Sequence, residues 1–297
     1  MQEEVVKEGG IRVDAYVASI TDISRTKIAN MIKNEEILVN NKKVKASYIL
    51  EENDVIQIGE YEPEIMDAKP EKMDLDIVYE DDDVIVINKA NGVVVHPAPG
   101  NTSGTLVNGL LYHFKNLSKV NGNLRPGIVH RIDAYTTGLL MVAKNDYAHN
   151  KLASELSEQK TNRKYIALVH GVINNDTGII DAPIGRDPKN RKKMTVTDVN
   201  SKEAVTEFKV LERFKNATLL EVTLKTGRTH QIRVHMNYIN HPVVNAPVYG
   251  NRKLIDETGQ CLHAKTIGFN HPRTGKYMEF TSELPECFVN IMKKFQE

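Results

Sequence analysis

Residues 125–145 read RPGIVHRIDAYTTGLLMVAKN, and this stretch decides which fold the sequence predicts. Residues 138–143 form an uninterrupted apolar run of strand length, which predicts a buried strand. A carboxylate, Asp133, lies in the polar turn before it, after the basic pair His130 and Arg131. An isolated Asp in such a turn is most often a turn or capping residue. The stretch alone therefore predicts a loop and a buried strand, and leaves the role of Asp133 open.

A second polar stretch, KTGRTHQIRVHM, occupies residues 225–236. Ile232, Met236 and Ile239 recur at i, i+4 and i+7, which predicts an amphipathic helix. Arg233 shares this helix, so we expect its side chain to be partly buried. Because a buried guanidinium requires a carboxylate partner, this arginine should pair with an acid from elsewhere in the chain.

The rest of the sequence predicts more strands than helices. Strand patterns occur in LDIVYEDDDVIVINKA (75–90), RKYIALVHG (163–171), AVTEFKVLERF (204–214) and ATLLEVTLKTG (217–227). Helical patterns occur near 106–111 and 146–158. Because the strands do not alternate regularly with helices, the expected fold class is α+β rather than doubly wound α/β.

Residues 11–60 predict a separate small module. Val13, Val17 and Ile20 predict one helix, and Ser24 is a suitable N-cap for a second. The stretch ILVNNKKV (37–44) predicts a β-hairpin, because Asn tolerates the positive φ of a tight turn. An acidic segment with two prolines follows. The expected organisation is a module at 1–62, a linker at 63–74 and a larger domain at 75–297.

Composition argues against several classes of protein. No stretch approaches the roughly 20 apolar residues of a membrane helix, and the N-terminus lacks the layout of a secretory signal. The two cysteines, Cys261 and Cys287, provide no disulfide framework. GNTSGT (100–105) lacks the lysine of a phosphate loop, and His230 and His235 are five residues apart, off the spacing of two zinc ligands on a helix. We therefore expect a soluble, cytoplasmic protein with no cofactor, no nucleotide, no metal and no membrane partner.

The formal net charge is zero, but the charges are unevenly divided. Residues 1–90 carry 11 Lys and Arg against 21 Asp and Glu, whereas residues 91–297 carry 28 against 18. Such an asymmetry permits a polyanionic partner for the basic part. A basic domain that is merely soluble is the alternative.

Taken together, the motifs resemble the pseudouridine synthases of the RluA/RluD type, which act on large-subunit ribosomal RNA. The family signature H-R-L-D-x-x-[ST]-[ST]-G corresponds to residues 130–138, HRIDAYTTG. Further matching segments follow in order at 88–113, 163–171, 184–194, 226–236, 241–250 and 262–285. The resemblance spans essentially the whole chain and implies a pseudouridine synthase fold with a mixed, largely antiparallel central sheet.

The resemblance also implies roles for three residues. Asp133 would be the nucleophile or base that acts at the ribose of a flipped-out uridine. Arg233 would be the guanidinium that keeps this carboxylate ionised. Tyr165 would be the active-site tyrosine, whose ring stacks on the detached uracil and whose hydroxyl assists proton removal from carbon 5. Without the resemblance, Tyr165 would be an ordinary strand tyrosine. Arg131 would enter the space that the flipped base leaves.

The N-terminal module resembles the S-four RNA-binding domain, which grips RNA backbone with its second helix and the following turn. The side chains expected to contact RNA or substrate are Arg131, His130, Arg228, His230, Arg186, Lys189, Arg191, Lys192, Lys193, Arg25, Lys27, Lys33, Lys42 and Lys43, with Lys45 in the same basic segment. A solvated charged loop and helix face are the alternatives. The expected partner is 23S ribosomal RNA, bound by a monomer. A tRNA modifier and a non-catalytic ribosome-assembly factor remain alternatives.

Two departures from the family pattern stand out. The family commonly has N-K-P where this chain has Asn88, Lys89 and Ala90. It usually has Gly-Asp where this chain has Asn245 and Ala246. The second change removes a carboxylate from a loop, and the sequence does not say whether it affects RNA contacts or stability.

Overall fold

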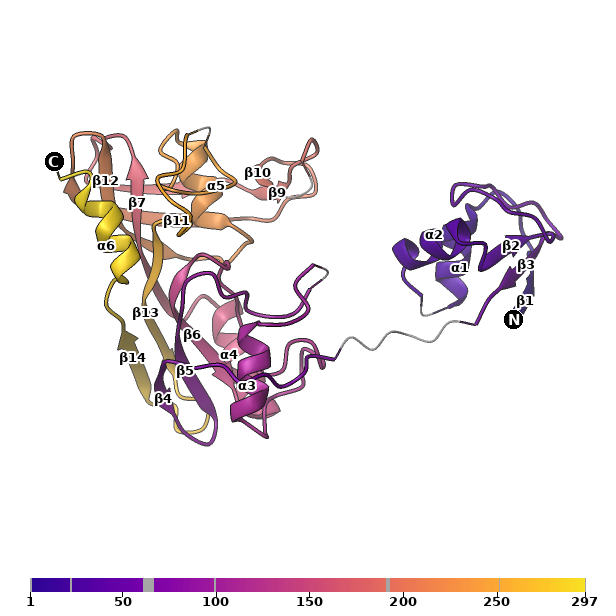
Figure 1. Cartoon of the computed structure of the whole chain (residues 1–297), viewed down its shortest axis with the longest axis horizontal. Helices are drawn as coiled ribbons and strands as arrows, with labels where there is room; N and C mark the ends of the chain where they lie inside the picture. Colours follow the sequence, from indigo (N-terminus) through magenta and orange to yellow (C-terminus); the bar gives the residue numbers. More distant parts are fainter. Residues whose placement is uncertain are drawn as a thin grey trace. The chain divides into compact units, whose positions relative to one another are not determined.

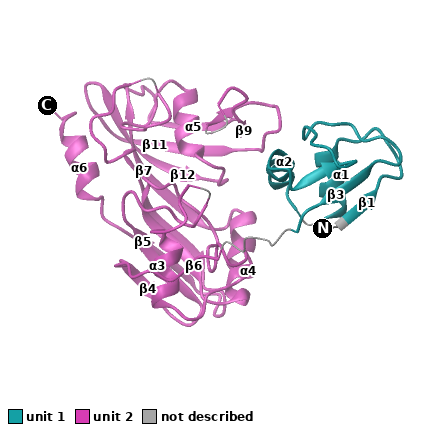
Figure 2. Ribbon diagram, turned by 45° about the vertical axis from the view of Figure 1, so that its right-hand side comes forward, with its two compact units in different colours: residues 1–65 teal, residues 66–297 magenta. Residues whose placement is uncertain are grey.

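The structure, a computed structural model, describes residues 2–21, 23–60, 67–98, 100–190, 193–250 and 252–296. The chain divides into two units, Met1–Ile65 and Met66–Glu297, which Figure 2 colours separately. The described residues of the first unit form one apolar core cluster, and those of the second unit form five. In the part of the chain that the structure describes, no helix is long and apolar enough to span a membrane.

The first unit has two helices and a three-stranded antiparallel sheet (Figure 1). The elements are β1 (Gln2–Val5), α1 (Val13–Ile20), α2 (Arg25–Lys33), β2 (Ile37–Val39) and β3 (Val55–Ile58), with strand order β1-β3-β2. The Ser24 side chain accepts a hydrogen bond from the Lys27 backbone N–H, so the predicted N-cap is confirmed. Asn40 and Asn41 adopt φ values of 52° and 59° in the predicted tight turn.

Two details of this unit differ from the sequence prediction. Beyond the turn only a single bridge joins Lys42 to Val39, because β2 pairs with β3 rather than with residues 42–44. The other side of β3 pairs with β1, a strand that the sequence pattern did not indicate.

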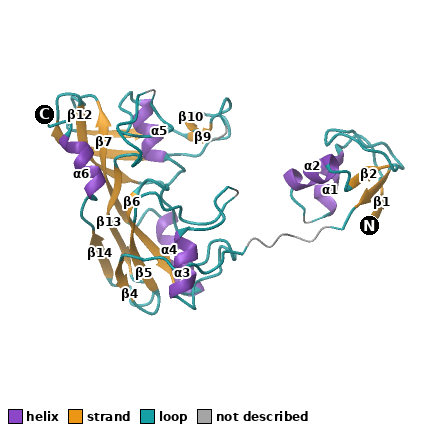
Figure 3. Cartoon of the chain, viewed as in Figure 1, coloured by secondary structure: helices purple, strands orange, loops and turns teal. Residues whose placement is uncertain are grey.

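The second unit is built on a mixed nine-stranded sheet (Figure 3). Its main path is β4 (Ile77–Glu80), β5 (Val84–Lys89), β6 (Thr137–Ala143), β13 (Leu262–Asn270), β7 (Asn162–His170), β12 (Ala217–Leu224), β11 (Val205–Arg213) and β8 (Thr177–Asp181), with β14 (Tyr277–Thr281) beside β13. Only β6 and β13 pair in parallel; the other pairs of this sheet are antiparallel. A separate ribbon joins β9 (Ile184–Arg186) to β10 (Met194–Val196). The predicted α+β class and largely antiparallel sheet are confirmed.

Helices cover both faces of this sheet, which explains the apolar run in β6. The α3 helix (Leu106–His113) shares a cluster with Leu140 and Val142, whereas α4 (Asp146–Ser157) shares one with Leu139 and Met141. Successive strand residues point to opposite faces, so a strand buried on both has no polar position. In the same way α5 (Gln231–Tyr238) packs with one set of β7 and β12 side chains and α6 (Glu286–Lys293) with the other.

The C-terminal part of the predicted linker belongs to the second unit. The Asn108 side chain in α3 donates to the Lys69 carbonyl, and the Glu71 N–H donates to the Asn108 carbonyl. His113 contacts the Met73 carbonyl. Segment 69–73 therefore packs on α3, and a linker that continues to Asp74 needs correction. A local polar composition could not reveal this contact, because the partners Asn108 and His113 lie 39 and 40 residues further along the chain than the carbonyls they contact.

Candidate active site

The turn before β6 carries Asp133, which lines a cleft of the second unit. The Asp133 carbonyl accepts a hydrogen bond from the Thr136 N–H, and β6 begins at the next residue. Gly138 has φ +105°, and a Cβ there would lie 2.3 Å from the Ala264 carbonyl oxygen. The glycine that ends the motif, Gly138, is therefore required for β6 to approach β13 closely. This close approach fixes where the turn ends.

Asp133 and Arg233 form an ion pair at the start of α5. The Arg233 Nη1 donates to Asp133 Oδ2 at 2.8 Å; the arginine side chain is 4% exposed and the aspartate 22%. The guanidinium carbon also lies 4.9 Å from the centre of the Tyr249 ring, a cation–π distance. Asp133 is thus the carboxylate partner that the sequence required for a buried Arg233.

His230 adjoins the same carboxylate. His230 is the N-cap residue of α5 and has φ 57°. Its Nε2 lies 3.8 Å from Asp133 Oδ1. Burial lowers the pKa of His230, against the opposing charge of Asp133, so the ring is neutral at pH 7. The Met194 N–H donates to the Tyr249 hydroxyl, which lies 2.8 Å from His230 Nδ1. This network favours a hydroxyl that donates to Nδ1 and an Nε2–H that faces Asp133.

Tyr165 lies on β7 and lines a cleft together with Asp133 and His230. Its side chain is buried, and burial together with the charge of Asp133 raises its pKa, against the opposing charge of Arg163. The group is therefore a neutral phenol at physiological pH. Its ring forms part of an apolar cluster with Ile232 of α5 and Leu262 of β13. All three residues also line the cleft.

The cleft has a volume of about 690 Å³, within the usual range for a ligand site. Among the described residues, Asp133 is the only acidic one that lines it, and the basic lining residues are Arg125, Arg131, Arg163, Arg228 and Arg233, with His96, His130 and His230. A concave surface lined with so many cations and one carboxylate is electrostatically suited to a polyanion.

Lys89, at the end of β5, stabilises the turn that carries Asp133. Its Nζ donates to the carbonyls of Ala90, Val93 and Ala134, at 2.9, 2.9 and 2.7 Å. Burial lowers the pKa of Lys89 to about 7, and the charge of Asp133 opposes this shift. Ala134 follows Asp133 directly, so the ammonium fixes the backbone beside the carboxylate. The sequence offered one signal for this residue, a lysine at the end of an apolar strand.

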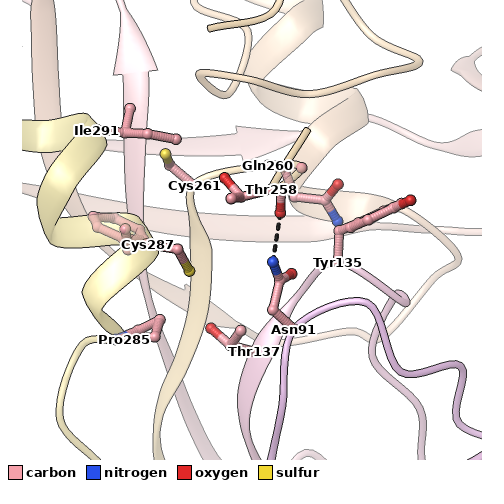
Figure 4. A pocket seen from close by; sticks show the side chains of 11 residues that line it. Asn91, Tyr135, Thr137, Thr258, Gln260, Cys261, Pro285, Cys287 and Ile291 are labelled. Carbon is pink, nitrogen blue, oxygen red and sulfur yellow. Dashed lines mark hydrogen bonds between the residues drawn. The ribbon is translucent and has the colours of Figure 1, made fainter. Parts of the chain in front are cut away.

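A neighbouring loop, which contains Thr258 and Gln260, braces the turn that carries Asp133. Figure 4 shows these two loop residues beside Asn91 and Tyr135. The Asn91 side chain donates to the Thr258 carbonyl at 2.7 Å, and Gln260 donates to the Thr136 hydroxyl at 3.1 Å. A Cβ on Gly259 would lie 2.4 Å from the ring of Tyr135. The turn that carries Asp133 is thus held by packing as well as by hydrogen bonds.

Asn245 organises this loop, which explains one departure from the family pattern. It has φ +59°, a conformation that Gly adopts freely and that Asn tolerates. Its amide donates to Asp256 Oδ1 and to the Gly259 carbonyl, and its oxygen accepts from the Ile255 N–H. Ala246 is buried in an apolar cluster. In this chain the changed pair has a structural role.

The predicted RNA-contacting residues of the second unit are placed unequally. His130 Nε2 accepts from the Met141 N–H, and burial lowers the pKa of this histidine to about 3, so it carries no charge at neutral pH. Arg131 is exposed, with Nη1 3.4 Å from His96 Nε2, and Arg228 Nε donates to the Glu203 carbonyl.

Arg186 and Lys189 are exposed in the β9–β10 segment, and Lys193 is half-buried there. The charge of Arg186 contributes to the lowered pKa of His230, so this segment adjoins the site. The predicted contacts Arg191 and Lys192 lie outside the described residues.

In the first unit, acidic residues of the same unit neutralise part of the predicted basic surface. Arg25 donates to both carboxylate oxygens of Asp14 at 3.0 Å, and Lys43 pairs with Glu35 at 2.8 Å. Lys33, Lys42 and Lys45 are exposed and have no ion-pair partner among the described residues, and Lys27 is half-buried. Among the predicted cations, these three are the ones most available to a phosphate.

In the described part of the chain, no group of three or more His, Cys, Asp or Glu side chains is arranged to hold a metal ion. The geometry instead brings together a paired carboxylate, a buried phenol and a ring of arginines. Sequence reasoning named Asp133, Arg233 and Tyr165 but missed Lys89 and Arg163, whose importance depends on burial.

Comparison with known proteins points in one direction. A family model described as RNA pseudouridylate synthase matches residues 83–238, and the S4 (S-four) domain model matches residues 11–56. An RNA pseudouridine synthase of Bacillus subtilis is 54% identical, over 96% of this chain and 94% of its own length. The ribosomal large subunit pseudouridine synthase D of Pseudomonas aeruginosa is 41% identical, over 97% and 93%.

The fold is also found in a solved structure, that of the human RNA pseudouridylate synthase domain containing 1. It superimposes with a TM-score of 0.59 and 24% identity, over 80% of this chain and 98% of its own. This likeness supports the fold alone.

Proposed function

This chain belongs to the RNA pseudouridylate synthase family, and on that premise we propose that it isomerises uridines of 23S ribosomal RNA with Asp133 as the reacting carboxylate. The isomerisation breaks the bond between ribose C1′ and uracil N1, turns the base, and joins C5 to the same ribose carbon, while C5 loses its proton and N1 takes one up. Atoms and electrons are conserved overall. The observation that carries the proposal is the Asp133–Arg233 ion pair inside an arginine-lined cleft.

The two oxygens of Asp133 have different surroundings. Oδ2 accepts the hydrogen bond from Arg233, whereas Oδ1 lies 3.8 Å from Nε2 of the neutral His230 ring, beyond hydrogen-bond range. Oδ1 is therefore the oxygen available to the ribose, either for attack on C1′ or for removal of a ribose proton. Arg233 holds the carboxylate in position through this step.

Tyr165 and Arg131 complete the proposed substrate handling. A uridine within RNA must leave its stack to reach Asp133, at a free-energy cost of a few kcal/mol. The exposed Arg131, two residues before Asp133, is suited to enter the vacated space. The buried ring of Tyr165 offers a surface on which the detached uracil can turn while it stays in the cleft.

Two features support ribosomal RNA as the substrate. The relative from Pseudomonas aeruginosa is named a large-subunit pseudouridine synthase and aligns over nearly the whole chain. The N-terminal unit matches the S4 domain, and its exposed lysines are suited to phosphate contacts. We propose that the enzyme acts as a monomer, because the described residues that line the cleft all belong to one unit of one chain. We also propose that it acts in the cytoplasm, where its proposed RNA substrate is found.

Mapping of pseudouridines in cells with and without this protein tests the substrate. We expect specific pseudouridines of 23S ribosomal RNA to disappear when the protein is removed, and to return when it is supplied again. Loss of pseudouridines from tRNA alone would show that the tRNA alternative is correct. Unchanged maps of both RNAs would contradict the proposal.

A further inference from the structure

One buried arginine of the cleft, Arg163, has no side-chain partner among the described residues. Arg163 lies on β7, two residues before Tyr165, so both side chains point to the same face of the sheet. The residue is only 7% exposed, and it lines the cleft together with Asp133 and Arg233.

The Arg163 side chain forms no hydrogen bond and no ion pair with any described residue, and its Nε is buried without an acceptor. The buried Arg233, by contrast, is paired with Asp133, and Arg228 donates to a backbone carbonyl. A guanidinium cannot lose its charge at physiological pH, so an unpaired buried one is unfavourable for folding. Such a group fits a site whose missing acceptor arrives with the ligand.

The neighbouring loop leaves room for this side chain. A Cβ on Gly227 would lie 2.8 Å from Arg163 Nη1. Gly227 lines the same cleft, in the loop that precedes α5. The absence of a side chain at this position keeps the guanidinium in its place beside the cavity.

We propose that Arg163 binds a negatively charged oxygen of the RNA substrate inside the cleft. The inference rests on the proposed function and adds a substrate-binding residue to it. Two groups of the substrate can supply such an oxygen. One is a phosphodiester beside the flipped uridine. The other is uracil itself, because cleavage of the C1′–N1 bond leaves the bonding electron pair on N1, from where it spreads to O2 and O4.

The test compares Arg163→Met with Arg163→Lys and with a control arginine, Arg213→Met. Arg213 pairs with Asp176, is absent from the cleft lining, and donates to the Ile173 carbonyl. Thermal midpoints, RNA dissociation constants at several salt concentrations, and single-turnover rates are measured for all three and for the wild type. The RNA is a large-subunit ribosomal fragment that the wild type modifies.

We expect Arg163→Met to melt at the same temperature as the wild type or a few degrees higher, because it removes an unpaired buried charge. Turnover by the folded protein should fall at least about 30-fold. If the oxygen belongs to a phosphate, RNA binding weakens, the log–log salt slope becomes shallower by about 0.7–0.9, and Arg163→Lys restores part of the affinity. If it belongs to uracil, affinity and slope stay near the wild type and only the rate falls. Arg213→Met should keep wild-type turnover.

Wild-type turnover and affinity in Arg163→Met would overturn the proposal. So would a lower thermal midpoint with unchanged turnover per folded molecule, because the residue would then be structural. If the wild type modifies only tRNA, the substrate proposal fails, and the same variants are then compared on that RNA. Failure of the two proposals can thus be told apart.

Discussion

Replacement of Arg233 by Met tests the ion pair that holds the reacting carboxylate. Loss of one partner of a buried pair costs about 3–5 kcal/mol, and we expect the lower end, about 3 kcal/mol, because the Asp133 side chain keeps 22% exposure to water. For a unit of this size that corresponds to a decrease of roughly 6–12 °C in Tm. If the same free energy is lost from the orientation of Asp133 in the transition state, turnover falls by about two orders of magnitude.

The assay measures Tm and single-turnover pseudouridine formation, with the rate expressed per folded molecule. Arg273→Met is a matched control. Arg273 Nη2 lies 2.6 Å from the carboxylate of Asp83, whose side chain is only 4% exposed. This control also leaves a buried carboxylate unpaired, but it is not part of the cleft lining.

The control should lose stability and keep its rate. The reasoning would be refuted if Arg233→Met retained both the stability and the rate of the wild type. It would also be refuted if the two variants lost activity equally per folded molecule.

Three further predictions concern the domains, the bracing loop and pH. Removal of residues 1–60 should leave a folded, active second unit, since no core cluster includes both units, but with weaker RNA binding and a shallower salt slope in titrations; identical slopes would contradict an RNA-binding role of the first unit. Gly259→Ala should lower both Tm and turnover, because its Cβ would clash with Tyr135, whereas Gly275→Ala, also at positive φ but with nothing within 4 Å, should lower Tm only slightly. Burial lowers the pKa of His263 to about 4, so the unfolded chain binds its proton at a higher pH; the contribution of this one group to stability should fall from pH 6.5 towards 4 by at most about 1.4 kcal/mol per pH unit, and His263→Gln should remove that part of the decrease in Tm.

Local patterns predicted the elements whose cause is local. Side chains a few residues apart determine the N-cap at Ser24, the two helices of the first unit and the apolar strand that ends at Ala143. The pairing of Arg233 also followed, because a buried guanidinium on an amphipathic helix requires a carboxylate. The family motif, and not the spacing, identified the partner carboxylate as Asp133, 100 residues earlier in the chain.

The features that sequence reasoning missed depend on contacts between distant segments. The strand β1 has a weak pattern of its own and is formed because β3 offers it a free edge. Lys89 and Arg163 look like ordinary strand residues until the fold buries one beneath the reacting turn and the other in the cleft. In the sequence Asn245 is only a departure from the family motif. Its positive φ and its four hydrogen bonds show a structural role.

The central claim is that Asp133 carries out the chemistry, and one substitution tests it most directly. Asp133→Asn keeps the shape of the side chain and leaves Arg233 an oxygen to bind, but removes the negative charge that the reaction requires. Pseudouridine formation is measured on a ribosomal RNA fragment, beside RNA affinity and Tm. We predict a folded protein that binds the RNA and forms no pseudouridine. Substantial turnover by the folded Asp133→Asn protein would contradict the account.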